Sequence, residues 1–175
     1  MNEKVVNLTE DRKRFEALRD QVRSLIMATV DGQAVPRASY APFVRDSGSF
    51  YVYLSRLSDH TRELLQNPMV SVMLIEDEAE ASQIFARKRI TYLCESQTLE
   101  SDEAGHDTVL ELLTRRFGNV MILLQTLPDF VLFRLKPVSG RFVTGFGKAY
   151  ELTGDGMDEL AHIGPEDVNR AGSGG

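Results

Sequence analysis

The sequence predicts a mainly β fold, in which six or seven strands form a small antiparallel barrel with short helices inserted between them. Several short runs alternate apolar and polar residues or are rich in β-branched and aromatic residues, as strands are. Turn signals such as Asp31-Gly32 join neighbouring runs, which is typical of hairpins. No glycine-rich phosphate loop follows a strand, and this argues against a nucleotide-binding βαβ sheet.

The first element is expected to be a helix. Thr9 is a suitable N-cap, and Phe15, Leu18, Val22 and Leu25 recur at helical spacing, with the helix ending near Arg23. Asp31-Gly32 then predicts a tight hairpin, because both residues accept a positive φ. The strands expected next are Ser24–Val30, Ala34–Phe43 and Phe50–Leu54.

A second helix is expected between a cap at Ser58 or Asp59 and a stop at Asn67-Pro68, because the residue before proline avoids helical geometry. Val70–Ile75 is almost wholly apolar and predicts a strand buried on both faces. The acidic run Glu76–Glu80 is expected to be a solvated loop. After it, the pattern predicts a strand at Arg89–Leu99, a helix from a cap at Ser101 to Phe117, and a short helix at Asn119–Thr126.

The stretch Asp129–Tyr150 is predicted to form two strands. In the first, Val131, Phe133 and Leu135 share a buried face, and the other face is expected to be partly wet. Pro137–Gly140 interrupts the alternation and predicts a turn before the second strand. Gly145 and Gly147, on either side of Phe146, indicate a bulge, a barrel corner or the close approach of a ligand.

One domain is expected over residues 1–153, with the helix at its N-terminal side, and residues 154–175 are expected to be a flexible tail. The net charge of −6 argues against nucleic-acid binding. No apolar run approaches the roughly 20 residues that cross a bilayer, and no secretory signal is evident, so a cytoplasmic protein without membrane insertion is expected. Cys94 is expected to be a buried, inert thiol.

Two clusters of polar residues are candidate binding sites. Ser55, Arg56 and Thr61 lie at a strand-to-helix junction, where free N–H groups favour a phosphate or carboxylate; an ordinary capped helix is the alternative. Arg87 and Arg89 are expected on one side of a strand, where two guanidiniums can clamp carboxylates; a charge run that balances Glu76–Glu80 is the alternative.

Asp129 and the three histidines are less specific candidates. Asp129 precedes an apolar strand, where an acid caps a turn or orients a histidine or a water molecule. His60, His106 and His162 are scattered, and a lone histidine is more often solvated or packed than a ligand. The sequence contains no cluster with zinc-ligand spacing.

Four blocks of the sequence are distinctive when taken together: Ala38–Phe43, Asn67-Pro68 with Val70–Asp77, Phe85–Arg89, and Asp129–Leu135 with Gly145–Tyr150. These blocks resemble the haem-utilisation proteins of the HugZ and HutZ type, in register from about residue 12 to residue 162. This family is similar to the pyridoxamine 5′-phosphate oxidase group, whose members have a split β-barrel of the flavin mononucleotide (FMN)-binding type and are usually homodimers.

The resemblance implies a haem-binding protein of bacterial iron acquisition that opens the haem ring oxidatively at a dimer interface. Arg89 matches a family arginine near the haem, Asp129 an acid that hydrogen-bonds the iron-ligating histidine, and His60 a histidine beside the site. The family's ligand is a histidine of the C-terminal tail, but Asp167 stands at that position here. Either His162 or His60 would then have to hold the iron, or haem is held in another way.

Two alternatives remain open at the level of sequence. One is an FMN-binding oxidoreductase, in which Ser55, Arg56 and Thr61 hold the FMN phosphate. The other is a haem carrier that binds haem without degrading it.

Overall fold

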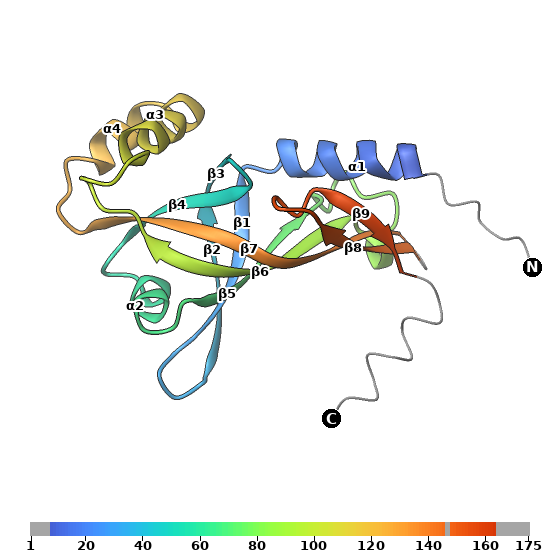
Figure 1. The fold of residues 1–175 in the computed structure, drawn as a ribbon, viewed down its shortest axis with the longest axis horizontal. Coiled ribbons are helices and arrows are strands. Elements are labelled where there is room, and N and C mark those ends of the chain that lie inside the picture. Colours follow the sequence, from blue (N-terminus) through green and yellow to red (C-terminus); the bar gives the residue numbers. More distant parts are fainter. Residues whose placement is uncertain (1–7, 146–147, 164–175) are drawn as a thin grey trace, which may run out of the picture.

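The computed structural model describes residues 8–145 and 148–163 as one long, curled antiparallel sheet with helices at its two ends (Figure 1). The helices are α1 (Leu8–Gln21), α2 (Asp59–Gln66), the short 3₁₀ turn η1 (Ile84–Ala86), α3 (His106–Phe117) and α4 (Asn119–Leu124). The strands are β1 (Ser24–Val30), β2 (Pro36–Pro42), β3 (Val44–Asp46), β4 (Ser49–Ser55), β5 (Met69–Ile75), β6 (Arg89–Thr98), β7 (Phe130–Gly145), β8 (Lys148–Thr153) and β9 (Glu159–His162).

The predicted fold class is confirmed, with more strands than expected. The described part of the chain forms nine strands, seven of which run in the order β2-β1-β5-β6-β7-β4-β3; β8 pairs with the last part of β7, and β9 pairs with β8. Every pairing is antiparallel. The extra strands arise because β3 is separate from β2 and because β9 forms in the segment where a flexible tail was expected.

Two apolar cores lie on opposite faces of the sheet. The larger core fills the inside of the curl and includes Phe15 of α1, Phe50, Tyr92 and Phe142, all fully buried. The smaller core lies under the α3–α4 hairpin, where Leu132 of β7 packs with Val109 and Leu113. The face of β7 that was expected to be partly wet is therefore buried at Leu132, because the inserted helices cover it.

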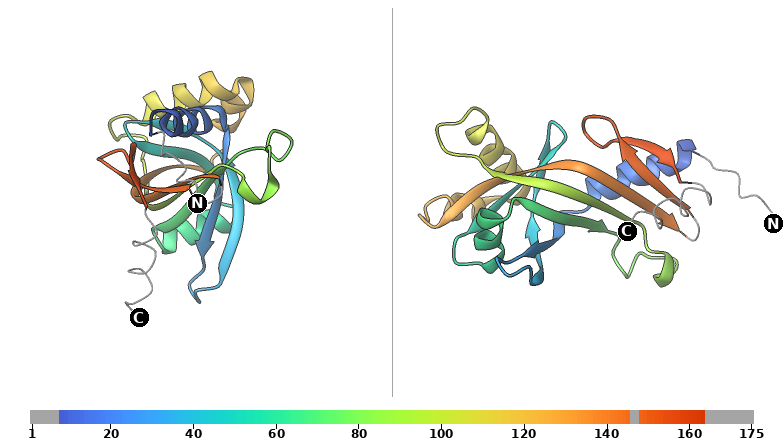
Figure 2. Two further views of the ribbon diagram at one scale, coloured as in Figure 1. Left: turned by 90° about the vertical axis from the view of Figure 1, so that its right-hand side faces the viewer. Right: turned by 60° about the horizontal axis from the view of Figure 1, so that its bottom comes forward.

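The predicted turn at Pro137–Gly140 is wrong. β7 is one strand of 16 residues that runs the length of the molecule (Figure 2). Leu93 of β6 pairs with Ser139 and Cys94 with Pro137, so Val138 is an extra residue in β7. A bulge tolerates a proline that cannot donate to the ladder, and it shifts the buried face from odd-numbered to even-numbered residues. The break in alternation therefore marks a bulge within one strand.

Smaller corrections concern helix and strand boundaries. Leu25 belongs to β1 rather than to the first helix. α3 begins at His106 with Gly105 as its N-cap, four residues after the expected cap at Ser101. β5 is fully buried on one face and only partly buried on the other, because no helix covers its second face along most of its length. The bulge predicted near Gly145 is present, whereas Phe146 and Gly147 lie outside the described residues.

The β1–β2 hairpin forms as predicted, but its loop has five residues rather than two. The Asp31 carboxylate accepts hydrogen bonds from the backbone N–H groups of Gln33 and Val35, both at 2.9 Å. The positive φ of 63° falls on Ala34 and not on Asp31 or Gly32. The aspartate side chain therefore shapes this turn, as in an Asx-turn.

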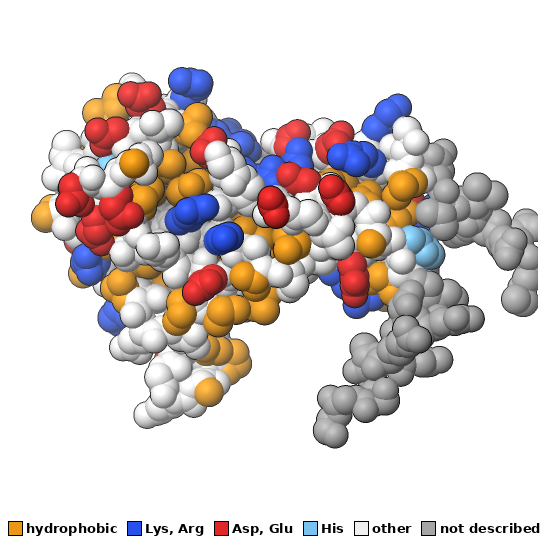
Figure 3. All heavy atoms as spheres, viewed as in Figure 1, with side chains coloured by type: hydrophobic (Ala, Val, Ile, Leu, Met, Phe, Trp, Pro, Cys, Tyr) orange, Lys and Arg blue, Asp and Glu red, His pale blue; other side chains and the backbone are white. Residues whose placement is uncertain are grey.

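The outer face of β2, β1, β5 and β6 is apolar and exposed, and we refer to it as the outer apolar face. Tyr40, Ile26 and Met73 lie on one row across three strands, and Leu93 lies two rows away. Tyr40 is 70% exposed, and hydrophobic side chains gather beside the β1–β2 hairpin in Figure 3. Exposed apolar patches of this kind usually mark interaction surfaces. None of the helices in residues 8–145 and 148–163 is long and apolar enough to span a membrane.

Replacement of Gly140 by alanine is predicted to destabilise the protein. A Cβ atom at this position would lie 2.7 Å from Leu152 Cδ1 and 2.9 Å from Tyr92 Cδ1. We expect Gly140→Ala to lower the free energy of unfolding by about 1–3 kcal/mol, as overpacking does. Urea denaturation measures this. Gly32→Ala is the matched control, since its nearest neighbour atom is 3.6 Å away; equal stability of the two variants would contradict the prediction.

Candidate functional site

The first group of predicted site residues meets where β4 ends and β7 begins. The Ser55 hydroxyl donates a hydrogen bond to Asp129 Oδ2 at 2.5 Å, and the Arg56 backbone N–H donates to the Asp129 carbonyl at 2.7 Å. The Leu57 N–H donates to Ser55 Oγ at 3.1 Å. Asp129 is thus fixed from both its backbone and its side chain, and its second carboxylate oxygen can accept a further hydrogen bond.

His60 and Thr61 lie in the first turn of α2, next to this junction. His60 is half-buried, and burial lowers its pKa more than the nearby Glu63 and Asp59 raise it. Its imidazole is therefore neutral at neutral pH, which is the form that binds iron. Thr61 is fully buried, and its hydroxyl has no hydrogen-bond partner among the described residues. Arg56 is exposed.

The sequence reasoning missed the buried carboxylate that holds α2 on the sheet. Glu63 is buried and accepts hydrogen bonds from Thr29 Oγ1 of β1 at 2.5 Å and from Arg37 Nε of β2 at 2.7 Å. The hydrogen bond from Thr29 and the ion pair with Arg37 lower the pKa of Glu63, although burial opposes this. Glu63 lies 26 residues after Arg37 and 34 residues after Thr29, so no local sequence pattern predicts the contact.

The basic run before β6 divides between two roles. Arg87 binds the Glu76 carbonyl and pairs with Glu78 at 3.0 Å, and Lys88 pairs with the Glu76 carboxylate. The charge-balancing interpretation therefore holds for Arg87 and Lys88, and Glu76 is buried rather than solvated. Arg89 donates one hydrogen bond to the Arg87 carbonyl at 3.2 Å and pairs with no carboxylate of the described residues. Its other N–H groups are available to a ligand.

His162 lies in β9, at the same end of the sheet as Arg89 but on the other face. The side chains of Ile90, Phe142, Tyr150 and His162 form one row across four strands, and Arg89 belongs to the neighbouring row. The His162 ring packs edge-on against Tyr150, with 5.5 Å between ring centroids, and the residue is exposed. Asp167 lies outside the described residues.

The structure separates the predicted site residues into two groups. One group is Ser55, His60 and Asp129 at the start of β7, and the other is Arg89 and His162 beside its end. Phe130 pairs with Ser55, whereas Val143 pairs with Arg89. Thirteen residues of strand between them span roughly 40 Å. The two groups therefore cannot contact one small ligand within a single copy of the chain.

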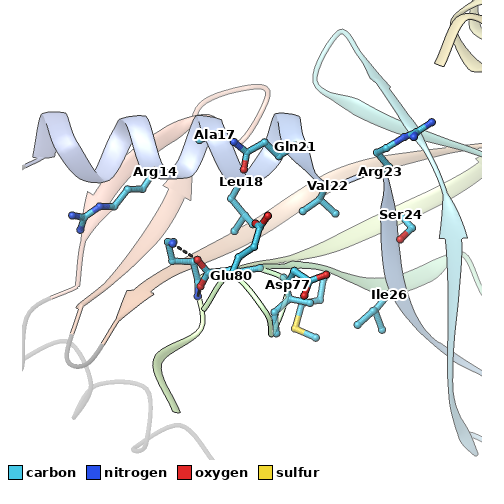
Figure 4. Close-up of a pocket in the computed structure, with 14 residues that line it drawn as sticks. Arg14, Ala17, Leu18, Gln21, Val22, Arg23, Ser24, Ile26, Asp77 and Glu80 are labelled. Carbon is cyan, nitrogen blue, oxygen red and sulfur yellow. Dashed lines mark hydrogen bonds and ion pairs between the residues drawn. The ribbon is translucent and has the colours of Figure 1, made fainter. Parts of the chain in front are cut away.

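A groove of about 670 Å³ lies between α1 and the sheet, near the Arg89 end (Figure 4). Figure 4 shows Leu18 extending from α1 towards the loop that carries Asp77 and Glu80. Leu18, Ile26 and Met73 give the groove an apolar lining, and charged residues surround it. None of the predicted site residues lines it. The described residues contain no group of three or more His, Cys, Asp or Glu side chains that could hold a metal ion.

Comparisons with known proteins point to one family. A family model described as pyridoxamine 5′-phosphate oxidase matches residues 11–144. The curated protein named heme oxygenase HutZ, from Vibrio cholerae, is 43% identical over 149 residues, which is 85% of each chain. Two crystal structures are also similar to this chain. One is of HutZ from V. cholerae, described as a heme storage protein; it is 42% identical in sequence, has a TM-score of 0.69, and the match covers 71% of this chain and 88% of that one. ChuZ from Campylobacter jejuni is 29% identical with a TM-score of 0.79, covering 90% of this chain and 64% of that one.

Glu63 is predicted to hold α2 in place through its negative charge. Glu63→Gln keeps the shape of the side chain and removes the charge that Arg37 and Thr29 bind. We expect a loss of about 2 kcal/mol in the free energy of unfolding at pH 7, as for a hydrogen bond to a charged group. Because the folded-state pKa is lowered from 4.5, this contribution is complete above that value and is lost as the pH falls through the folded-state pKa.

The matched control for this prediction is Glu111→Gln, which makes the same change at an exposed position of α3. Chemical denaturation of both variants and the parent protein between pH 7 and pH 4 gives the comparison. A difference between the parent protein and Glu63→Gln that stays constant down to pH 4 would show that the charge is not what matters. An equal loss of unfolding free energy in Glu111→Gln would show that the contacts of Glu63 with Thr29 and Arg37 do not account for the effect.

Proposed function

The chain belongs to the pyridoxamine 5′-phosphate oxidase family, and from this premise we propose that it is a haem-binding protein of bacterial haem and iron utilisation. In this proposal the protein acts as a homodimer in the cytoplasm and opens the haem ring oxidatively. The relatives named for heme support the ligand, because HutZ is similar to this chain over most of both sequences. The observation that supports a site shared between two copies of the chain is the large distance between the two groups of site residues.

A dimer related by a two-fold axis resolves that separation. Suppose that the outer apolar faces of two copies pack together and that the two-fold axis lies between them, perpendicular to the strands. The Arg89 end of one copy then lies beside the Asp129 end of its partner. Arg89 shares a row with Ile75 and therefore lies on the outer side of the sheet. The face offers Tyr40, Ile26 and Leu93 as exposed apolar contacts, and isologous interfaces of this kind are the commonest in soluble homodimers. Each dimer then holds two equivalent sites.

The residues present fit a haem group. Its propionates need cations, and Arg89 has N–H groups that are not engaged by a described carboxylate. Its iron needs a neutral imidazole, and the protein offers His60 and His162. The haem supplies the redox-active iron, whereas the chain binds and orients it. Asp129, fixed by Ser55, is positioned to accept a hydrogen bond from an N–H or O–H group at the site.

Two other functions compete with this one. Storage without degradation is supported by the description of the HutZ crystal structure as that of a heme storage protein. FMN binding is supported by the family model alone. The phosphate-binding candidates favour it less, because the Ser55 hydroxyl is already donated to Asp129 and Thr61 is fully buried. Ascorbate added to the haemin complex under air, with catalase present, distinguishes degradation from storage by loss or persistence of the Soret band.

Mixed dimers test the shared site directly. We expect Arg89→Ala and Asp129→Asn homodimers each to bind haemin at least about tenfold more weakly, since each loses a charge-assisted contact. In a mixed dimer of the two variants, one site carries both substitutions and the other carries neither. Co-expression with two affinity tags isolates the mixed dimer, and haemin titration should then show one high-affinity site per dimer.

The control is a mixed dimer of Arg89→Ala with the double variant Arg89→Ala, Asp129→Asn, in which neither site is intact. It should show no high-affinity site. A high-affinity haemin site in this control, or the absence of one in the first mixed dimer, would contradict a site built from two copies. A protein that is monomeric at micromolar concentration would contradict it as well.

The iron ligand is predicted to be His162 or His60, and each is tested separately. His162 is exposed and lies in the last described strand, close in sequence to position 167, where the resembling family has its ligand, although its row faces the opposite side of the sheet from Arg89. We expect His162→Ala to shift and broaden the Soret band of the haemin complex, while His60→Ala retains its position. His106→Ala, which removes a histidine from α3, is the control. The opposite result, with the band altered only in His60→Ala, would assign the iron to His60.

A further inference from the structure

A second pocket, separate from both groups of site residues, is lined by residues from the C-terminal end of α1, from strand β3 and its neighbours, and from the C-terminal end of α3. Its volume is about 330 Å³. Three arginines from three elements line it: Arg19 of α1, Arg45 of β3 and Arg116 of α3. We call it the arginine pocket. Neither the haem-binding candidates nor Ser55, Arg56 and Thr61 take part in it.

Two of these guanidiniums are held in place by one carboxylate. Asp158 Oδ1 accepts hydrogen bonds from Arg45 Nη2 at 2.5 Å and from Arg19 Nη1 at 3.1 Å. Arg45 Nη2 also donates to the Gly156 carbonyl at 3.1 Å. The turn before β9 therefore locks both side chains, and a ligand that meets them loses little side-chain entropy on binding.

Arg116 is held without any carboxylate partner among the described residues. Its Nη2 donates to the Val22 carbonyl at 2.8 Å, and its guanidinium lies 5.4 Å from the centre of the Phe43 ring. Burial, followed by the nearby charge of Arg23, lowers its pKa, and the charge of Asp20 opposes this. A partly buried guanidinium that no carboxylate hydrogen-bonds is costly, and proteins usually pair such groups.

Two polar atoms of this pocket's arginines are left unsatisfied. Nε of Arg45 and Nε of Arg116 are both buried and have no hydrogen-bond partner within residues 8–145 and 148–163. Buried N–H groups without partners are uncommon, and each needs a physical explanation. Both atoms belong to guanidiniums that line the pocket, so hydrogen-bond donors are in excess around it.

The local charge also favours an anion. Asp20 and Asp46 line the pocket, and Asp158 stands behind it, so three carboxylates face the three lining arginines. Arg23 adds a fourth guanidinium, whose N–H donates to the Arg116 carbonyl at 2.8 Å. The three lining arginines and the three carboxylates balance, so the one positive charge left over is that of Arg23, which lies beside the pocket and does not line it. Asp158 is already shared between two of the lining arginines.

We propose that the arginine pocket binds the phosphate group of a small molecule. Planar guanidiniums with fixed N–H donors match the several oxygens of a phosphate, and arginines from different elements surround it from more than one side. The pocket's volume lies at the lower end of the range for ligand sites, which suits a small phosphorylated molecule rather than a macrocycle. This site does not depend on the proposed haem function.

Isothermal titration of the full chain with inorganic phosphate, at constant ionic strength in chloride, tests the proposal. We expect saturable binding that Arg116→Gln weakens at least about tenfold, the effect of losing about one charge-assisted contact. Arg115→Gln, at the neighbouring exposed position of α3, is the matched control and should leave the affinity unchanged. Succinate, a dicarboxylate, is the second probe and should bind more weakly than phosphate.

A second variant keeps the test valid if Arg116→Gln fails to fold. Arg45→Lys keeps the charge that Asp158 needs but removes the Nε donor, so it should fold and still bind phosphate more weakly than the parent protein. No saturable binding to the parent protein would overturn the proposal. The same affinity in Arg116→Gln as in Arg115→Gln would also overturn it, and tighter binding of succinate would overturn the assignment to phosphate.

Discussion

The hydrogen-bonded ladder of β7 is the constraint on which the rest of the structure depends. This strand pairs with β4 along its first part, with β6 along most of its length and with β8 along its last part. The bulge at Val138 lets one strand present odd-numbered residues to the core in its first half and even-numbered residues in its second half. Both ends of the molecule, and therefore both groups of candidate site residues, take their positions from it.

Local sequence patterns predicted most of the elements, because helices and strands bury side chains at different periods. Phe15 and Leu18 marked α1, and the alternation around Phe133 marked the first half of β7. The same reasoning placed a turn at Pro137–Gly140, since a bulge and a turn interrupt alternation in the same way. Gly105 rather than Ser101 caps α3, because the residues between them form turns of their own.

The candidate site was less predictable, because its contacts join distant parts of the chain. Asp129 and Ser55 were each recognised as polar residues at strand ends, but only the pairing of β4 with β7 brings them together. Glu63 is a charged residue of a short helix and was overlooked, although it is buried against Thr29 and Arg37. The large separation of Arg89 from Asp129 also depends on β7 being one strand rather than two.

The place of β7 in the chain has a consequence for synthesis. Strands β3 and β4 join the rest of the sheet only through β7, and Phe50 pairs with Leu135, 85 positions later. Such distant pairings form slowly. On the ribosome, the nascent chain must keep the apolar side chains of β4 and β6 uncovered until residues 130–145 have left the exit tunnel. The unfinished sheet therefore exposes apolar surface, and is prone to aggregate, until β7 has been synthesised.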